Sequence, residues 1–387
     1  MPDAAVYDLE GPEDAPVVLL LGSLGTTMSV WEHQIAALRP WFRLLRVEHP
    51  GHGGTGVPDG PGTVEALGRR LVLQMDHLGV GRAHFVGLSL GGLVGMWLAA
   101  KHPDRVDRLV LVSTTPRFNA PEAYRDRAVA VRAHGTGHIA TAAMARWFTQ
   151  PAAPANAGTV ARYSAMLSGI DPQGYAYCCE AVADADLRPE VARICAPTLV
   201  VAGANDPVVP PEVAVAGATG IAGAVMVVLP GAAHLVNVEQ PAAFNDAVVR
   251  HLAGGPEERG LAVRRAVLGD AHVDRALAAT TPMTAEFQQM LAKWPWGEVW
   301  ARPGLDRRTR RMLTIAMLVA LNRPEELEMH INAAVGDGIG ESDLKEVLLQ
   351  AAAYAGVPAA NSAFAIADRV VRRRTGQYHD GAPGPAG

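Results

Sequence analysis

One serine lies in a sequence typical of a catalytic nucleophile. The pentapeptide Gly87-Leu88-Ser89-Leu90-Gly91 matches the pattern G-x-S-x-G, and it stands between an apolar segment at 83–87 and a helical segment at 90–101. In such a strand–turn–helix context the glycines permit a tight turn that exposes the serine hydroxyl. The start of the following helix favours developing negative charge. The chain contains 40 glycines, so the pattern alone could arise by chance and the context carries the interpretation.

A neutral serine needs a base, and that base needs an orienting carboxylate. In this arrangement the order along the chain is serine, acid, histidine. Asp206 follows the apolar segment 198–202, and His234 follows the apolar segment 225–229. Taken singly, Asp206 is also explained as a turn-capping residue and His234 as a loop histidine. Their order and their positions after strands together predict a triad of Ser89, His234 and Asp206.

Acyl transfer also needs backbone N–H donors for the oxyanion. We expect one from Leu90, directly after the nucleophile, and one from Leu24, in the loop after the first core strand. A plain tight turn is the other explanation of that loop. His49 and His52 in the segment HPGHGG are expected to pack beneath the site, and we assign them no catalytic role.

The elements that must position these residues alternate along the first two thirds of the chain. Strands are expected at 17–21, 43–47, 83–87, 109–113, 198–202 and 225–229, with helices at 64–79, 90–101 and 240–252. This alternation predicts an α/β hydrolase fold with a mostly parallel sheet covered on both faces.

The segment at about 117–186 breaks the alternation, and we expect it to form a helical cap over the carboxyl edge of the sheet. In this cap Trp147, Arg146 and Arg162 are weaker candidates for lining the pocket and meeting a substrate carboxylate.

The strand pattern ends after the Gly- and Pro-marked segment 253–260. Helices are expected at 261–279, 284–292, 306–321, 325–336, 341–354 and 358–373. The sequence therefore predicts a hydrolase domain at 1–254, a linker at 255–259, an all-helical domain at 260–376 and a disordered tail at 377–387.

Within the helical domain, Glu326 and His330 are four residues apart on one helix and face the same way. A carboxylate beside an imidazole raises its basicity and fixes its tautomer, which suits an acid or base near neutral pH. An ordinary surface pair explains the spacing equally well. The tryptophans and arginines at 294–312 form either an anion pocket or a core with its rim.

Composition limits the classes of function. The 387 residues are 49% hydrophobic and 19% charged, with a formal net charge of -5, which argues against a nucleic-acid binder with a basic stripe. Cys178, Cys179 and Cys195 have neither disulfide-framework nor metal-ligand spacing. No signal-peptide pattern or membrane-length apolar run is present. We therefore expect a cytoplasmic protein without membrane partner, metal or cofactor.

Two long sets of segments resemble two enzyme families. Residues 1–254 resemble the 3-oxoadipate enol-lactonases, α/β hydrolases of protocatechuate breakdown, at GSLGTTMSVW, HPGHGGTG, FVGLSLGG, RWFTQ, GYAYCCEAVADADLR, VAGANDPVVP and GAAHLVNVEQP. Residues 260–376 resemble the 4-carboxymuconolactone decarboxylases at VRRAVLGDAHVDRA, WGEVWARPGLDRRTRRM, ELEMHINAAVGDGI and EVLLQAAAYAGVPAANSAF.

The decarboxylases are similar to the alkyl hydroperoxidase D-like superfamily, whose redox members carry C-x-x-C before a histidine. Here His330 holds the place of that histidine, while Arg323 and Glu326 hold the cysteine positions. Thiol-based peroxide reduction is therefore not expected of this domain.

The resemblance implies a bifunctional enzyme of the β-ketoadipate pathway that acts on small lactones. The helical domain would decarboxylate 4-carboxymuconolactone, with His330 as proton donor paired with Glu326. The remaining carboxylate would be held by Arg302, Arg310 or Arg311, for which bidentate arginine is suited. The hydrolase domain would then open the enol-lactone. Relatives of the helical domain form rings, which implies a homo-oligomer assembled through that domain.

Two other functions compete with this one. The first is a hydrolase of another ester or lactone, whose helical domain is only an oligomerisation scaffold; the C-terminal segments argue against it. The second is a binding protein on an inactive hydrolase fold, against which the complete serine, aspartate and histidine set argues.

Overall fold

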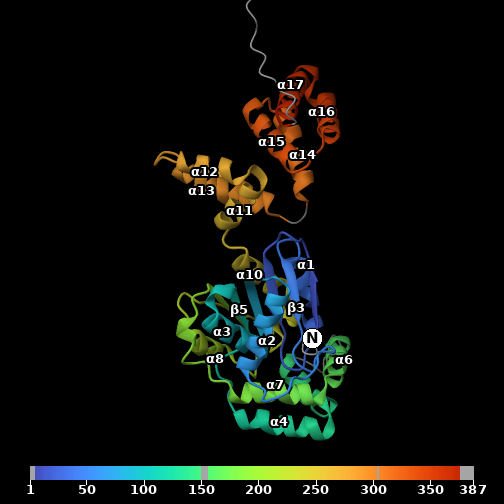
Figure 1. Ribbon diagram of the computed structural model, residues 1–387, viewed down its shortest axis with the longest axis vertical. Coiled ribbons are helices and arrows are strands. Elements are labelled where there is room, and N and C mark those ends of the chain that lie inside the picture. Colours follow the sequence, from blue (N-terminus) through green and yellow to red (C-terminus); the bar gives the residue numbers. More distant parts are fainter. Residues whose placement is uncertain (1–4, 150–155, 303–304, 375–387) are drawn as a thin grey trace, which may run out of the picture. The chain divides into compact units, whose positions relative to one another are not determined.

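The computed structural model describes residues 5–149, 156–302 and 305–374. The chain divides into two compact units, the first ending at Ala253 and the second beginning at Gly254 (Figure 1). Each unit buries a hydrophobic core of its own. The predicted tail at 377–387 lies outside the described residues. Within the described ranges, no helix has the length and apolar character needed to cross a membrane.

The first unit is built on a seven-stranded sheet in the order β1-β3-β2-β4-β5-β6-β7. The strands are β1 (Tyr7–Glu10), β2 (Val17–Leu21), β3 (Arg43–Val47), β4 (Ala83–Leu88), β5 (Val106–Val112), β6 (Thr198–Gly203) and β7 (Val225–Leu229). Strands β2 to β7 pair in parallel, because crossover connections return the chain to the same end of the sheet. The edge strand β1, which the sequence analysis did not predict, pairs antiparallel with β3.

Helices cover both faces of this sheet. They are α1 (Glu32–Leu38), α2 (Val64–His77), α3 (Leu90–Lys101), α8 (Pro211–Ala218), α9 (Val236–Glu239) and α10 (Pro241–Leu252), with short 3₁₀ turns η1 (Met28–Trp31), η2 (Pro103–Arg105), η3 (Thr136–Ile139) and η5 (Val191–Arg193). Helix α3 packs on β4 and β5, while α10 packs on β5, β6 and β7. Every residue of β4 and β6 is buried, as strands covered on both faces require. The predicted fold class is confirmed.

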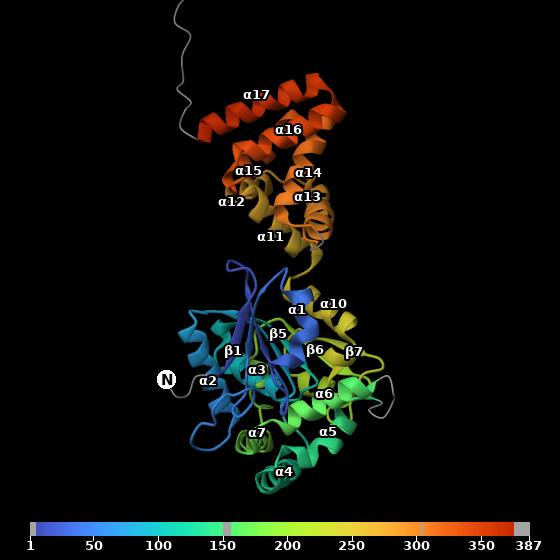
Figure 2. The same ribbon diagram turned by 90° about the vertical axis from the view of Figure 1, so that its right-hand side faces the viewer.

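The segment between β5 and β6 forms a helical cap. Its helices are α4 (Pro121–His134), α5 (Ala140–Trp147), α6 (Ala157–Ser168) and α7 (Pro172–Asp184). Figures 1 and 2 show α4 and α7 side by side beyond one end of the sheet. Ion pairs from Arg125 to Asp184 and from Arg132 to Glu180 join these two helices.

The second unit contains helices joined by turns, with no strand among its described residues. It contains α11 (Pro256–Leu268), α12 (Asp270–Ala278), α13 (Ala285–Leu291), the π-helix η6 (Ala292–Trp300), α14 (Arg307–Ala320), α15 (Pro324–Gly336), α16 (Glu341–Ala355) and α17 (Val357–Arg374). Its core is formed by apolar side chains from α14 to α17, among them Ile315, Leu327 and Leu348.

Three expectations for this unit are wrong. Most of the predicted linker at 255–259 is the first turn of α11, because Pro256 suits a first helical position and acidic residues follow it. The single helix expected at 261–279 is broken at Gly269, whose φ of 85° leaves the helical region. The helix expected at 284–292 runs on as η6, which contains Pro295. Proline has no backbone N–H to donate, and the irregular hydrogen bonding of a π-helix tolerates the missing donor.

Candidate active sites

Ser89 occupies a strained turn between β4 and α3. Its φ of 55° and ψ of −109° are unfavourable for a residue with a side chain. Its N–H donates to the carbonyl of Val112 over 2.8 Å, and its carbonyl accepts from the Thr114 hydroxyl over 2.8 Å. A Cβ at Gly91 would lie 2.2 Å from the Leu21 carbonyl oxygen, so only glycine fits there. The surrounding strands thus hold the serine in the conformation of a nucleophile elbow.

The structure brings Asp206 and His234 together. Nδ1 of His234 lies 2.9 Å from Oδ2 of Asp206, and the residues are 2% and 3% exposed, respectively. The other oxygen, Oδ1, accepts from the N–H groups of Val208 at 2.8 Å and Val209 at 3.1 Å. A carboxylate can only accept, so Nδ1 carries the proton and Nε2 is left as the basic nitrogen. This is the relation that a triad requires between acid and base.

The loop expected to hold the oxyanion is fastened to the start of α3. The N–H of Gly91 donates to the carbonyl of Gly22 over 3.1 Å, which ties the loop carrying Leu24 to the turn carrying Leu90. Both leucines are buried. The proposed donors at Leu24 and Leu90 therefore belong to two segments joined by a hydrogen bond.

His49 and His52 support this same loop. His49 Nε2 lies 2.9 Å from the Gly22 carbonyl oxygen, and His52 Nε2 lies 3.0 Å from the N–H nitrogen of Gly25. Burial lowers the pKa of His49 to about 4; burial and repulsion from His49 lower that of His52 to about 3. They pack against the site as the sequence suggested, but the hydrogen bonds also give them a positioning role that the sequence analysis did not assign.

Trp147 lies where cap and sheet meet. A Cβ at Gly25 would be 3.4 Å from Trp147 Cη2, so the indole lies against the oxyanion loop. The Trp147 carbonyl accepts from the N–H of Leu235, the neighbour of His234, over 3.1 Å. This position beside both loops is consistent with the predicted place of Trp147 in the pocket.

The structure corrects the expectation for Arg162. Its Nη2 lies 2.5 Å from Oε1 of Glu32, and its guanidinium carbon lies 5.1 Å from the ring centroid of Tyr163. Arg162 thus joins α6 to the start of α1. Its guanidinium is held by Glu32 and Tyr163, and among the described residues it has no buried nitrogen left without a partner, so it is not a candidate substrate anchor.

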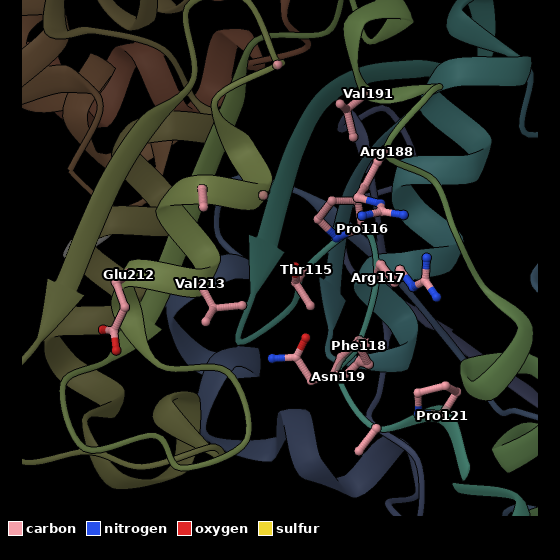
Figure 3. A pocket seen from close by; sticks show the side chains of 14 residues that line it. Thr115, Pro116, Arg117, Phe118, Asn119, Pro121, Arg188, Val191, Glu212 and Val213 are labelled. Carbon is pink, nitrogen blue, oxygen red and sulfur yellow. The ribbon is translucent and has the colours of Figure 1, made fainter. Parts of the chain in front are cut away.

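An open cleft of about 760 Å³ lies elsewhere on the first unit (Figure 3). It is lined by the segment after β5 and by residues of α8, including Phe118, Asn119 and Glu212. None of Ser89, Asp206 and His234 belongs to its lining. The cleft is therefore not assigned to the hydrolase chemistry.

In the second unit, His330 on α15 is 7% exposed and stacks on Trp300 of η6, with ring centroids 6.1 Å apart and planes inclined by 16°. Arg311 on α14 is 1% exposed and pairs with Asp337. Among the described residues, neither His330 Nδ1 nor Arg311 Nη1 has a hydrogen-bond partner. Two buried nitrogen atoms without partners, one on each side chain, mark a place where a polar ligand fits.

The electrostatics of His330 differ from the sequence-based expectation. Its pKa is lowered to about 4, first by burial and then by Arg311 and His272, while Glu326 raises it with the smallest effect of the four. Glu326 is exposed, whereas His330 is buried. The expectation that Glu326 makes His330 a near-neutral acid or base was wrong, because burial and cations outweigh one solvated carboxylate.

Of the three arginines considered for the retained carboxylate, Arg311 is the one that affects His330. Arg302 is exposed, and its carbonyl accepts from Arg310 over 2.9 Å. Arg264, which the sequence analysis did not single out, is buried and, after burial itself, lowers the pKa of His272. Both residues lie in VRRAVLGDAHVDRA, the segment that carried part of the family resemblance. Within the described residues, no group of three or more His, Cys, Asp or Glu side chains is arranged to hold a metal ion.

The fold and the elbow define the first unit as an α/β hydrolase. The family model described as alpha/beta hydrolase fold matches residues 16–241, and that of the Carboxymuconolactone decarboxylase family matches residues 285–369. The chain belongs to the α/β hydrolases through its first unit and to the carboxymuconolactone decarboxylase family through its second.

Three proteins show how close these relationships are. The 3-oxoadipate enol-lactonase 2 of Acinetobacter baylyi is 38% identical over 242 residues, which are 62% of this chain and 90% of the relative. The 4-carboxymuconolactone decarboxylase of the same organism is 44% identical over 115 residues, which are 30% of this chain and 86% of the relative. A crystal structure of the enol-lactonase from Burkholderia xenovorans LB400 is 40% identical and has a TM-score of 0.63, covering 65% of this chain and 96% of that one. The family resemblance is confirmed for both units.

Proposed function

We propose that this chain catalyses two consecutive reactions on a small acidic lactone. The second unit decarboxylates 4-carboxymuconolactone to 3-oxoadipate enol-lactone, and the first hydrolyses that product to 3-oxoadipate. The observation that carries the proposal is that one chain contains a unit 38% identical to an enol-lactonase and a unit 44% identical to a 4-carboxymuconolactone decarboxylase. The product of one reaction is the substrate of the other.

The first step needs an electron sink, which the substrate itself supplies. The departing carboxylate is attached to the ring carbon that is γ to an unsaturated lactone carbonyl. As CO2 leaves, the electrons of the broken C–C bond therefore flow through the double bond onto the carbonyl oxygen. Arg311 binds the carboxylate that stays. Because that anion offsets the charge of Arg311, it raises the pKa of His330, which then donates a proton to the carbon α to the carbonyl.

The second step is acyl transfer at Ser89. His234 takes the hydroxyl proton as Oγ attacks the lactone carbonyl, and Asp206 stabilises the imidazolium. The N–H groups of Leu24 and Leu90 hold the oxyanion. The C–O bond of the lactone breaks, the enolate leaves and is protonated to the ketone, and water then releases 3-oxoadipate from the serine.

The second unit is also proposed to assemble the chain into a homo-oligomer. Leu313 and Met317 on α14 and Leu321, the residue directly after it, are spaced four residues apart, and their side chains are exposed. Residues at this spacing form one stripe on a helix. An apolar stripe exposed to water is stabilised when a second copy covers it.

The deciding experiment supplies purified protein with 4-carboxymuconolactone and follows CO2 and products by NMR. Release of CO2 together with 3-oxoadipate supports both activities. Hydrolysis of supplied 3-oxoadipate enol-lactone without CO2 release would keep the first activity and reject the second. No turnover of either lactone would reject the proposal.

A further inference from the structure

Two cap arginines, Arg127 on α4 and Arg146 on α5, differ from their neighbours. Four other arginines of the cap each form an ion pair with a carboxylate: Arg117, Arg125, Arg132 and Arg162. Among the described residues, no carboxylate lies within ion-pair distance of Arg127 or Arg146. Both are partly buried, so water screens their charge incompletely. Unpaired cations in such a place are costly unless a ligand supplies the anion.

Arg127 also affects the electrostatics of Arg146. Burial lowers the pKa of Arg146, and the charge of Arg127 lowers it further. The guanidinium carbon of Arg127 lies 4.8 Å from the ring centroid of Tyr124. The two like charges are thus near one another with an aromatic ring beside them, and an anion bound by both would relieve their repulsion.

This cluster reaches the hydrolase site through Tyr175, a buried residue of α7. The Tyr175 hydroxyl interacts with the guanidinium of Arg127. A Cβ at Gly25 would lie 3.1 Å from Tyr175 Cε2, so the ring separates Arg127 from the oxyanion loop. Arg146 directly precedes Trp147, whose indole lies against the same glycine.

A second connection reaches the acid of the triad. The pKa of Tyr124 is raised mainly by burial, but Asp206 also raises it, so the phenol lies within electrostatic range of that carboxylate. Tyr124 therefore links Arg127, which lies over its ring, to the acid of the triad.

We propose that Arg127 and Arg146 form a carboxylate-binding subsite of the hydrolase unit, which selects lactones with an acidic side chain over neutral esters. This inference rests on the proposed lactone hydrolysis. The enol-lactone keeps an acetate side chain on its ring, and the guanidinium groups bind that carboxylate through paired N–H donors. The lactone carbonyl then lies toward Gly25 and the nucleophile.

The test compares 3-oxoadipate enol-lactone with its methyl ester, in which the side-chain charge is removed. We expect Arg127→Gln and Arg146→Gln each to reduce the ratio of kcat/KM for acid over ester by roughly 10- to 100-fold, mainly through a higher KM for the acid. Arg125→Gln is the matched control, because Arg125 lies on α4 but pairs with Asp184. It should keep the wild-type ratio.

An unchanged ratio in both glutamine variants would overturn the subsite while leaving the lactonase intact. Failure of the wild-type protein to hydrolyse the acidic lactone would instead reject the proposed function. A second measurement needs no variant. Adipate should inhibit the wild-type hydrolase at a concentration at least about tenfold lower than dimethyl adipate does. Equal inhibition by the two would also overturn the subsite.

Discussion

His52 accepts a hydrogen bond from the backbone N–H of Gly25, and only a neutral imidazole can do so. The ring is buried, and its second nitrogen, Nδ1, lies 2.7 Å from the Pro50 carbonyl oxygen. With Nδ1 donating to that carbonyl, Nε2 is left to accept. This hydrogen bond thus fixes the position of the loop that carries Leu24.

We expect His52→Ala to lower kcat for enol-lactone hydrolysis by about 10- to 100-fold, because the oxyanion donor is no longer held in position. The unfolding free energy should fall by about 1–3 kcal/mol, since the Gly25 N–H loses its buried partner. Steady-state kinetics and urea denaturation measure the two effects. His52→Gln offers an acceptor oxygen and should recover part of both. A fully active alanine variant would contradict the positioning role.

The low pKa values of His49 and His52 predict acid sensitivity. Both lie below the ordinary value of 6.5, at about 4 and about 3. From pH 6.5 down to about 4 the unfolded chain binds more protons than the native one, so the unfolding free energy decreases as the pH falls. Urea denaturation at pH 7 and pH 4.5 should show a smaller loss for His52→Gln than for the wild type.

Glu48 acts in the opposite sense, because burial raises its pKa to about 7. The contribution of Glu48 to the free energy of unfolding is complete below about pH 4.5 and is lost as the pH rises through 7. Glu48 is present in both the wild type and His52→Gln, so the difference between their losses of unfolding free energy isolates the effect of His52. Equal losses in wild type and variant would show that His52 is not buried in its neutral form.

Ser89→Ala separates the two reactions. We expect lactone hydrolysis to fall by about 10⁶, in line with other serine nucleophiles, while CO2 release continues and the enol-lactone accumulates. An NMR time course with 4-carboxymuconolactone follows all three species. Loss of CO2 release in this variant would show that the two activities do not have separate sites.

Arg311→Gln should abolish most decarboxylation and raise the pKa of His330. The guanidinium is buried beside the site, and its charge is one of the effects that hold that pKa near 4. An NMR titration of the His330 ring measures the pKa without turnover. Arg302→Gln is the control, since Arg302 is exposed. Equal losses of activity in the two variants would show that Arg311 has no special role.

Met317→Glu tests assembly through α14. A charge in the middle of the stripe of Leu313, Met317 and Leu321 should convert an oligomer to smaller species, because burying an unpaired carboxylate is costly. Light scattering after gel filtration gives the mass. Leu73→Glu, at an exposed position on α2 of the first unit, should leave the mass unchanged. An unchanged mass for Met317→Glu would exclude this face.

Much of the hydrolase site could be predicted from sequence because its signals are local. Ser89 lies within its own pentapeptide, and Asp206 and His234 each follow a strand whose apolar run is visible in the chain. The partner of Arg162 could not be found this way, because Glu32 is 130 positions away and on another helix. The contrast between paired and unpaired cap arginines could not be predicted from sequence either, because it depends on how α4 packs against α7.

The second unit was harder for the same reason. The spacing of Glu326 and His330 correctly places both on one helix, but burial decides which neighbours matter. Arg311 and His272, from other helices, outweigh the carboxylate one turn away. The π-helix of η6 was also missed, because Pro295 is normally evidence against a helix.

The division of the chain after Ala253 has a consequence for regulation under the proposed function. One translation event yields one decarboxylase unit and one hydrolase unit, so gene dosage, promoter strength and protein turnover cannot change their ratio. Below saturation, the steady-state concentration of the enol-lactone relative to that of its precursor is then set by the kinetic constants of the two sites. A change in expression therefore leaves this ratio unaltered, and only a mutation in one of the two units changes it.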